Sequence, residues 1–321
     1  METNLWRFLV VDVSDPSNPK PVSKLDLPGK PEGIQVVNQM AYVTAGNYLC
    51  QIDISQPAFS NIATLVGLEL GEGHESSGID VANGYAYVSG RNEFVVVNLT
   101  NSMSSAIVSS WINADYESDF QGIQVRDSYA YVLSASETSN TDIYRSNGTS
   151  TPPGKLFVFD ISIPTMLRLV AECKVGGRAR NIYLDGNYAY IAGGAWDDKP
   201  QDWRYGLEII DIHNPLHPVR VGALDTGGYA RDVKVKDGFA YIAAGDQGLL
   251  ILKATPVLQL NPPTISGQTL TLTWQEFPGV KLQRASSLYQ PIWKDVTISN
   301  RQSRIEMPMQ EASGYFRLHK P

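Results

Sequence analysis

The sequence predicts an all-β protein whose larger part is a β-propeller, followed by a small separate β-domain. A short pattern recurs five times at intervals of about 40 to 60 residues, which is the signature of a repeat architecture. Each repeat contains several short strand-like runs joined by Gly, Asn-Gly and Asp-Gly turns, and no helical periodicity interrupts them. Such repeats are typical of propeller blades, in which four-stranded sheets pack face to face around an axis.

The inner half of each predicted blade is marked by an Ala-Tyr-Val or Ala-Tyr-Ile triplet. The triplets lie at 41–43, 86–88, 130–132, 189–191 and 240–242. Upstream of each triplet is a run with a period of two, which indicates a strand. These runs lie at 33–36, 78–81, 122–125, 181–184 and 232–235. The run and the triplet are therefore expected to form the first and second strands of a blade.

A nearly continuous apolar run follows each triplet, and one more precedes the first triplet. Continuity indicates a third strand that is buried on both faces. The runs occupy 8–13, 49–54, 94–99, 156–161, 207–212 and 249–252. All but the last contain a short polar residue that is expected to bond the backbone two residues on and turn the chain: Asp12, Asp53, Asn98, Asp160 and Asp211. More polar runs, such as 106–111 and 168–174, then supply fourth strands.

The strand count leaves ring closure open between two readings. Residues 31–253 contain five first, second and third strands but only four fourth strands, and the N-terminus adds one third and one fourth strand. In the first reading, 23–27 completes the last blade, giving five blades and leaving 8–13 spare. In the second, the chain begins inside a blade and the intact ring has six or more blades.

Two segments resemble the LVIVD repeat family. They are 10–16 (Val-Val-Asp-Val-Ser-Asp-Pro) and 208–212 (Glu-Ile-Ile-Asp-Ile), each in a unit with the Ala-Tyr-Val/Ile triplet. The resemblance covers about residues 6 to 253. It implies a propeller-like protein that is extracellular or at the cell surface, and it implies no catalytic residues, because the family has no single agreed activity.

After Lys253 the repeat pattern stops, so we predict a propeller over 1–255 and a small all-β domain over 256–321. Alternating segments within 269–318 suit a small sandwich with Trp274 and Trp293 in its core. The closing Tyr315–Leu318 segment resembles the C-terminal modules of exported planctomycete and verrucomicrobial proteins, which implies attachment or sorting at a cell surface. The alternative is a domain that caps the open edge of the propeller.

Composition excludes several classes of partner. The formal net charge is -7 and no Lys/Arg run exceeds a pair, so nucleic acid is not an expected partner. No apolar run is long enough to predict a transmembrane segment, and the first 24 residues lack a signal-peptide pattern. Cys50 and Cys173 have neither disulfide-framework nor metal-site spacing, so no metal and no cofactor is expected.

One equivalent position just before each first strand is expected to face the mouth of the central channel. It holds Glu32, Ser77, Gln121, Arg180 and Arg231. Arg178, Arg180 and Arg231 come from consecutive blades and can form a cluster for a carboxylate or phosphate, with Asp232 nearby. The alternative is inter-blade salt bridging with Glu32, Asp119 and Asp232.

Two insertions between second and third strands, at 136–153 and 195–205, are expected on the same face as these arginines. The second combines aromatic and acidic side chains: Trp196, Asp197, Asp198, Trp203 and Tyr205. Such a mixture suits a sugar or a cationic ligand, because aromatic faces stack while carboxylates orient hydroxyls or amines. The alternative is that the tryptophans only hold a long loop onto the blade.

Together these features predict a non-enzymatic binding or scaffold propeller that takes a protein or glycan ligand at the channel mouth. The alternative is a hydrolase or lyase acting on saccharides at the same face, for which two carboxylates would need to flank the scissile bond.

Overall fold

The computed structural model describes most of both predicted domains. The described residues are 6–56, 64–68, 76–100, 105–113, 118–136, 154–176, 179–195, 204–254, 260, 263–274, 280–287, 289, 291–296, 304–308 and 314–319. The chain divides into two compact units, Met1–Lys253 and Ala254–Pro321. No helix in the described parts is long and apolar enough to cross a membrane.

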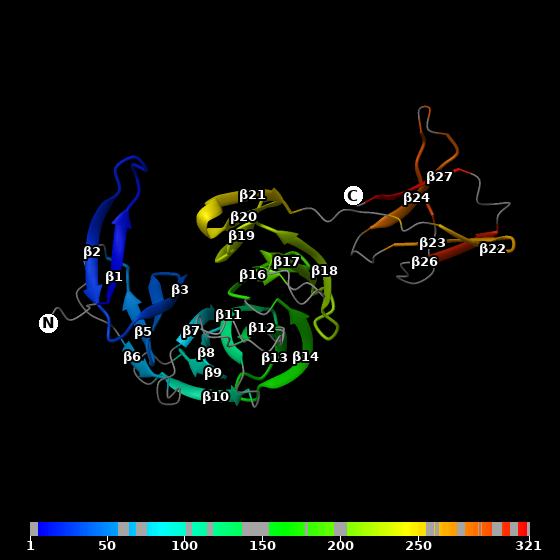
Figure 1. Cartoon of the computed structure of the whole chain (residues 1–321). Helices are drawn as coiled ribbons and strands as arrows, with labels where there is room; N and C mark the ends of the chain where they lie inside the picture. The colour runs from blue at the N-terminus through cyan, green and yellow to red at the C-terminus, as the bar shows by residue number, and fades with distance from the viewer. Residues whose placement is uncertain are drawn as a thin grey trace, which may run out of the picture. The chain divides into compact units, whose positions relative to one another are not determined.

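Within its described residues, the larger unit contains five antiparallel sheets of three or four strands that follow one another in chain order, preceded by a two-stranded sheet (Figure 1). The first strands are β3 (Pro31–Val37), β7 (Ser76–Ala82), β11 (Ser118–Arg126), β15 (Asn181–Asp185) and β19 (Asp232–Lys236). The second strands are β4 (Met40–Ala45), β8 (Tyr85–Gly90), β12 (Tyr129–Ser136), β16 (Tyr188–Ala195) and β20 (Phe239–Ala243). The third strands are β5 (Tyr48–Asp53), β9 (Glu93–Asn98), β13 (Gly154–Asp160), β17 (Arg204–Asp211) and β21 (Leu249–Lys253). The fourth strands are β6 (Thr64–Gly67), β10 (Ala106–Ile112), β14 (Arg168–Val175) and β18 (Val219–Asp225). The predicted blade pattern is confirmed.

Ring closure through the N-terminal fourth strand is wrong. β1 (Arg7–Asp12) and β2 (Lys20–Asp26) form a separate two-stranded sheet, while β19, β20 and β21 form a three-stranded sheet in the part of the chain that is described. The physical reason lies in the apolar side of the hairpin. Phe8 and Leu27 pack onto the first blade, against Cys50 and Ile52 among others, so β1 is the partner of β2 and not a spare strand.

The blades pack through alternate residues of their third strands. Phe94 of β9 contacts Phe159 of β13 at a ring-centroid distance of 5.0 Å, and Trp111 of β10 lies 5.1 Å from the same ring. On its other face β13 places Leu156 and Val158 in a cluster with residues of the next blade. The continuous apolar runs therefore arise because third strands are buried on both faces.

The predicted turn chemistry after the third strands is confirmed at every repeat in which it was expected. The backbone N–H groups of Ser14, Ser55, Thr100, Ser162 and His213 donate to the side-chain oxygens of Asp12, Asp53, Asn98, Asp160 and Asp211 at 2.8–3.0 Å. Because Asn98 makes the same bond as the aspartates, the carbonyl-type oxygen is what the turn requires.

Glycine lets the first strands of neighbouring blades approach each other closely. A Cβ atom at Gly78 of β7 would lie 2.8 Å from the Gln121 carbonyl oxygen of the next blade and 2.9 Å from Ser89 Oγ. At Gly122 of β11 it would lie 2.9 Å from Cα of Asn181. These positions exclude a side chain because the backbone of the next blade occupies the space.

The smaller unit contains two three-stranded sheets among its described residues. One has the order β22 (Thr264–Ser266), β23 (Thr269–Thr273), β26 (Arg304–Pro308), and the other β25 (Lys294–Asp295), β24 (Lys281–Ala285), β27 (Tyr315–His319). Trp274 is buried in the core, as expected. The expectation for Trp293 is wrong: it is half-buried outside that cluster, with the Arg317 guanidinium 4.2 Å from its ring centroid. The attachment or sorting role of this unit stays a prediction.

Replacing Asp160 by Asn is expected to reduce the loss of unfolding free energy that the protein shows as the pH falls into the acid range. Hydrogen bonds from Ser162 and the Arg168 guanidinium lower the pKa of Asp160 from 3.8 to about 2. A carboxyl group whose pKa is lowered in the folded state stabilises the folded protein at pH values above its ordinary pKa. This stabilisation is lost as the pH falls towards about 2. Urea unfolding at about pH 5 and about pH 2.5 should show a larger loss for wild type than for Asp160→Asn, by less than about 1 kcal/mol because the pair is near the surface. Identical losses would contradict this.

Replacing Gly78 by Ala is expected to lower the free energy of unfolding by about 1–3 kcal/mol, because the new methyl group overlaps the backbone of the next blade. Gly67→Ala is the matched control, since no atom of the described residues lies within 4 Å of a Cβ built at Gly67 of β6. The control should change stability by no more than about 0.5–1 kcal/mol. Equal urea midpoints for Gly78→Ala and wild type would show that the first strands are not constrained in this way.

Candidate functional site

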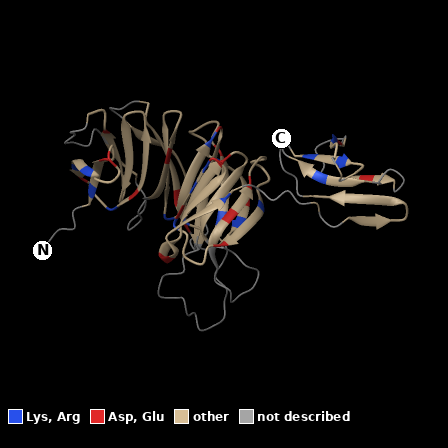
Figure 2. Cartoon of the chain, turned by 90° about the horizontal axis from the view of Figure 1, so that it is seen from above, with Lys and Arg blue, Asp and Glu red and all other residues tan. Residues whose placement is uncertain are grey.

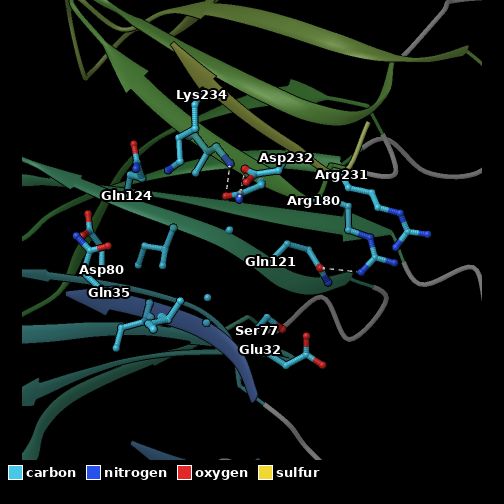
Figure 3. A pocket seen from close by; sticks show the side chains of 18 of the residues that line it. Glu32, Gln35, Ser77, Asp80, Gln121, Gln124, Arg180, Arg231, Asp232 and Lys234 are labelled. Carbon is cyan, nitrogen blue, oxygen red and sulfur yellow. Dashed lines mark hydrogen bonds between the residues drawn. The ribbon is translucent and has the colours of Figure 1, made fainter. Parts of the chain in front are cut away.

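The first strands of all five described blades enclose a polar cavity of about 680 Å³ (Figure 3). First strands of neighbouring blades lie side by side, so each contributes equivalent positions to the cavity wall. The repeat alignment places Glu32, Ser77, Gln121, Arg180 and Arg231 at one such position, and all five line the cavity. Residues far apart in the sequence are therefore brought to one wall by the blade repeat.

Two arginines share one aromatic ring at this cavity. The guanidinium carbon of Arg180 lies 5.9 Å from the ring centroid of Tyr229, and that of Arg231 lies 5.7 Å from it. Arg180 Nε donates to the Tyr229 hydroxyl at 2.7 Å, and Arg180 Nη1 donates to Gln121 Oε1 at 3.5 Å. The aromatic face and these neutral acceptors hold the guanidiniums without neutralising their charge.

The expected inter-blade salt bridges to these arginines do not form in the described part of the chain. Glu32 pairs with Lys30, and Asp119 Oδ1 lies 3.4 Å from Arg91 Nε. Asp232 accepts hydrogen bonds from the Asn181 amide at 2.7 Å and from its neighbouring backbone N–H. Figure 2 shows acidic and basic residues interspersed along the sheets, and the cavity lining likewise combines acidic residues with Arg180 and Arg231.

A second set of polar side chains lines the cavity from the middle of the first strands. Asp80 accepts the N–H of Val81 at 2.9 Å and the N–H of Val125, in the next blade, at 2.7 Å. Gln124 Oε1 accepts the N–H of Leu184, again in the next blade, at 2.6 Å. These contacts connect each blade to its neighbour, so this set has a structural role.

Electrostatics distinguishes Asp80 from an ordinary surface carboxylate. Burial raises the pKa of Asp80, while its backbone hydrogen bonds and the charge of Lys234 lower it in part. Lys234 lies over the ring of Tyr183 at 4.7 Å from the centroid, which gives the fourth and fifth blades a cation–π contact where earlier blades use a hydrogen bond. Asp80 and Lys234 thus contribute opposite charges to one cavity.

Comparison with known proteins identifies the repeats. The LVIVD repeat model matches residues 6–26, 28–64, 73–111, 176–226 and 227–253. The chain belongs to the LVIVD repeat family. The model match omits 112–175, yet β11 to β14 of this LVIVD repeat protein form a blade of the same topology. No curated protein matches the sequence.

Solved structures with TM-scores of 0.50 and above share the fold of this LVIVD repeat protein at low identity. Hydrazine synthase of Kuenenia stuttgartiensis has a TM-score of 0.52 and 14% identity over 79% of this chain and 67% of its own. Raptor of Chaetomium thermophilum has a TM-score of 0.50 and 12% identity over 86% of this chain and 25% of its own. BamB of Moraxella catarrhalis has a TM-score of 0.49 and 12% identity over 85% of this chain and 74% of its own. Identities this low show the fold alone.

The structure brings together part of the predicted site. Glu32, Arg180, Arg231 and Asp232 line the cavity. Several predicted residues lie outside the described part of the chain: Arg178, Trp196, Asp197, Asp198 and Trp203. Tyr205 belongs to β17, but its side chain is not among those described. Sequence reasoning missed Asp80, Gln124 and Lys234. The recurrence of such a residue at the same position of the apolar first strands was a signal that could have indicated them. Tyr229 carried no comparable signal.

Replacing Gln124 by Ala is expected to cost about 1–3 kcal/mol of unfolding free energy, because the N–H of Leu184 loses its acceptor. Gln35 occupies the equivalent position in the first blade and makes no hydrogen bond within the described residues, so Gln35→Ala is the matched control. The control should stay within about 0.5 kcal/mol of wild type in urea unfolding. Equal effects of the two substitutions would show that the bond to Leu184 does not connect the blades energetically.

Proposed function

We propose that this LVIVD repeat protein is a non-enzymatic binding propeller that takes an anionic group of a protein or glycan ligand at the channel mouth. The observation that carries the proposal is the pair of guanidiniums, Arg180 and Arg231, held against Tyr229 without an ion pair to any described carboxylate. A carboxylate or phosphate accepts two parallel hydrogen bonds from an Arg fork.

The geometry supports binding by reducing its entropic cost. The aromatic face of Tyr229 and the hydrogen bonds from Arg180 to Tyr229 and Gln121 limit the motion of a long side chain before a ligand arrives. The cavity volume of about 680 Å³ lies within the range of small-ligand sites, so a terminal residue or a sugar ring can enter. We expect the anionic group to orient that entering part.

The saccharide hydrolase or lyase alternative receives no comparable support from the described residues. Glycoside hydrolysis needs two carboxylates flanking the scissile bond. Of the acidic side chains that line the cavity, Asp80 binds two backbone N–H groups, Asp232 binds Asn181, and Glu32 pairs with Lys30. Each is already engaged within the protein, which favours recognition over acid–base chemistry.

We also propose that this binding takes place outside the cell or at its surface. The support is the resemblance of the repeats and of the C-terminal segment to exported proteins. Fractionation of the source cells, followed by immunodetection, should place the protein outside the cytoplasm, and recovery in the cytoplasm alone would reject this part of the proposal without bearing on the site.

A glycan and peptide array tests the site directly. Wild type should bind a subset of ligands that carry carboxylate or phosphate, and binding should weaken as salt rises. Arg180→Ala and Arg231→Ala should each weaken binding at least about tenfold, since a hydrogen bond to a charged group contributes about 1.5–3 kcal/mol. Arg7→Ala is the matched control, because Arg7 pairs with Asp26 on β1 and β2, away from the cavity.

The same array separates the arginines from the predicted aromatic loop. Trp196→Ala and Trp203→Ala should weaken only those ligands that present a sugar ring for stacking. If Arg180→Ala and Arg231→Ala both bind every ligand as wild type does, the channel-mouth proposal is wrong.

A further inference from the structure

Gln121 adds a hydrogen-bond donor beside the two arginines of the channel mouth. Arg180 Nη1 donates to Gln121 Oε1 at 3.5 Å, and this contact directs the oxygen of the amide at the guanidinium. The amide nitrogen, Nε2, then carries N–H groups that have no acceptor within the described residues. Because its oxygen is engaged by an arginine, Gln121 faces a ligand as a donor.

Hydrogen bonds of the main chain hold these residues in place. The N–H of Gly122 donates to the Arg180 carbonyl at 3.0 Å, and Ser89 Oγ donates to the Gln121 carbonyl. The N–H groups of Arg180 and Arg231 each donate to a carbonyl in the second strand of their own blade at 2.8 Å. The three side chains therefore start from backbone positions that are fixed before a ligand binds.

The three side chains offer donors only. The guanidinium of Arg231 makes no hydrogen bond to any described residue, so its N–H groups are available. Arg180 uses Nε for the Tyr229 hydroxyl and one N–H of Nη1 for Gln121, which leaves Nη2 and the other N–H of Nη1. The carboxylate of Asp232 already accepts hydrogen bonds within the protein. A group bound here must therefore accept hydrogen bonds from three side chains and carry the compensating charge.

A carboxylate satisfies only part of this site. Its two oxygens accept the parallel bonds of one Arg fork, or one bond from each arginine. Its single negative charge compensates one guanidinium, while Arg180 and Arg231 are both held against one ring. A phosphate monoester has three terminal oxygens and a charge of about −1.5 to −2 near neutral pH. Its acceptors match Arg231, Arg180 and Gln121, and its charge approaches that of two guanidiniums.

We propose that the channel mouth is specific for a phosphate monoester, with Arg180 and Arg231 compensating its charge and the Gln121 amide donating to its third oxygen. This inference rests on the proposed function, because it names the anionic group that the same two arginines bind. Gln121 determines the specificity, since an Arg fork binds carboxylate and phosphate alike.

The rest of the rim indicates what carries the phosphate. Figure 3 shows five side chains in order along one side of the cavity: Glu32, Ser77, Gln121, Arg180 and Arg231. The acidic end and the basic end orient the ligand, with its phosphate away from Glu32. Glu32 pairs with Lys30, but a carboxylate accepts several hydrogen bonds, so Glu32 and Ser77 suit hydroxyl groups. We therefore expect the phosphate to be carried by a small hydroxylated skeleton, such as a sugar ring.

Calorimetric titration of the full chain with three ligands of one skeleton tests the assignment. Glucose 6-phosphate, glucose 6-sulfate and glucuronate present a tetrahedral dianion, a tetrahedral monoanion and a planar monoanion at the same end of the ring. At about pH 8, where the second phosphate proton is lost, glucose 6-phosphate should bind at least about tenfold more tightly than glucuronate, because the bond from Gln121 is added. Glucose 6-sulfate should lie between them, since it reaches Gln121 but carries less charge.

Variants of Gln121 separate specificity from affinity. Gln121→Ala should weaken glucose 6-phosphate at least about tenfold and glucuronate by less than about threefold. Gln121→Glu keeps an acceptor for Arg180 but replaces the donor by a negative charge, so it should weaken the phosphate ligand more than the carboxylate ligand. All variants should keep the wild-type circular dichroism, since the Gln121 side chain is not fully buried.

Gln35→Ala is the matched control. Gln35 lines the same cavity from the first blade and makes no hydrogen bond within the described residues. This variant should keep the wild-type preference for glucose 6-phosphate over glucuronate.

The outcomes distinguish this inference from the proposed function. If Arg231→Ala weakens both ligands but wild type binds glucuronate as tightly as glucose 6-phosphate, the arginine site stands and the phosphate assignment is wrong. An unchanged preference in Gln121→Ala would reject the role of Gln121. Absence of saturable binding by glucose 6-phosphate would overturn the assignment even where ligands of the array bind. A phosphoserine peptide that binds more tightly than glucose 6-phosphate would overturn the hydroxylated skeleton.

Discussion

The close approach of neighbouring first strands is the constraint on which the rest of the propeller depends. It needs glycine at Gly33, Gly78 and Gly122, where a Cβ would meet the next blade at 2.8–3.0 Å. It also brings the side chains of Asp80 and Gln124 within hydrogen-bonding distance of backbone N–H groups one blade on. A glycine contact and a side-chain bond at the same level set the spacing of blades, and the apolar third strands then pack at that spacing.

This constraint also determines which polar groups are available to a ligand. The side chains of Asp80 and Gln124, in the middle of the first strands, bond the backbone of the next blade, whereas Arg180 and Arg231 lie one residue before β15 and β19. At that level Tyr229 supports both guanidiniums, and no described carboxylate pairs with them. Side chains in the middle of the cavity wall therefore hold the blades together, whereas Arg180 and Arg231 at its end are available to a ligand. Both sets come from the same repeated element.

Local pattern was enough to predict the blades and to place Arg180 and Arg231 at equivalent positions, because both follow from periodicity within one repeat. Strand alternation, the Asp12-type turns and the position before each first strand are properties of neighbouring residues. The pairing of β2 with β1 depends instead on where Phe8 packs, and the position of Trp293 depends on Arg317, which lies far away in the sequence. Tyr229 was missed for the same reason: its role arises only when two blades bring their arginines to one ring.

Repetition itself explains why the sequence could not distinguish Ile34 from Ile79. Both belong to a Gly-Ile-x-Val segment, and the apolar residues of such a segment suit burial against the strands of the preceding blade. Four of the five described blades meet that condition, and β3 does not, so identical local sequences end in opposite environments. In a repeat protein each unit encodes one half of an interface. The environment of a repeat unit is therefore determined by the strands that lie beside it and not by its own sequence alone.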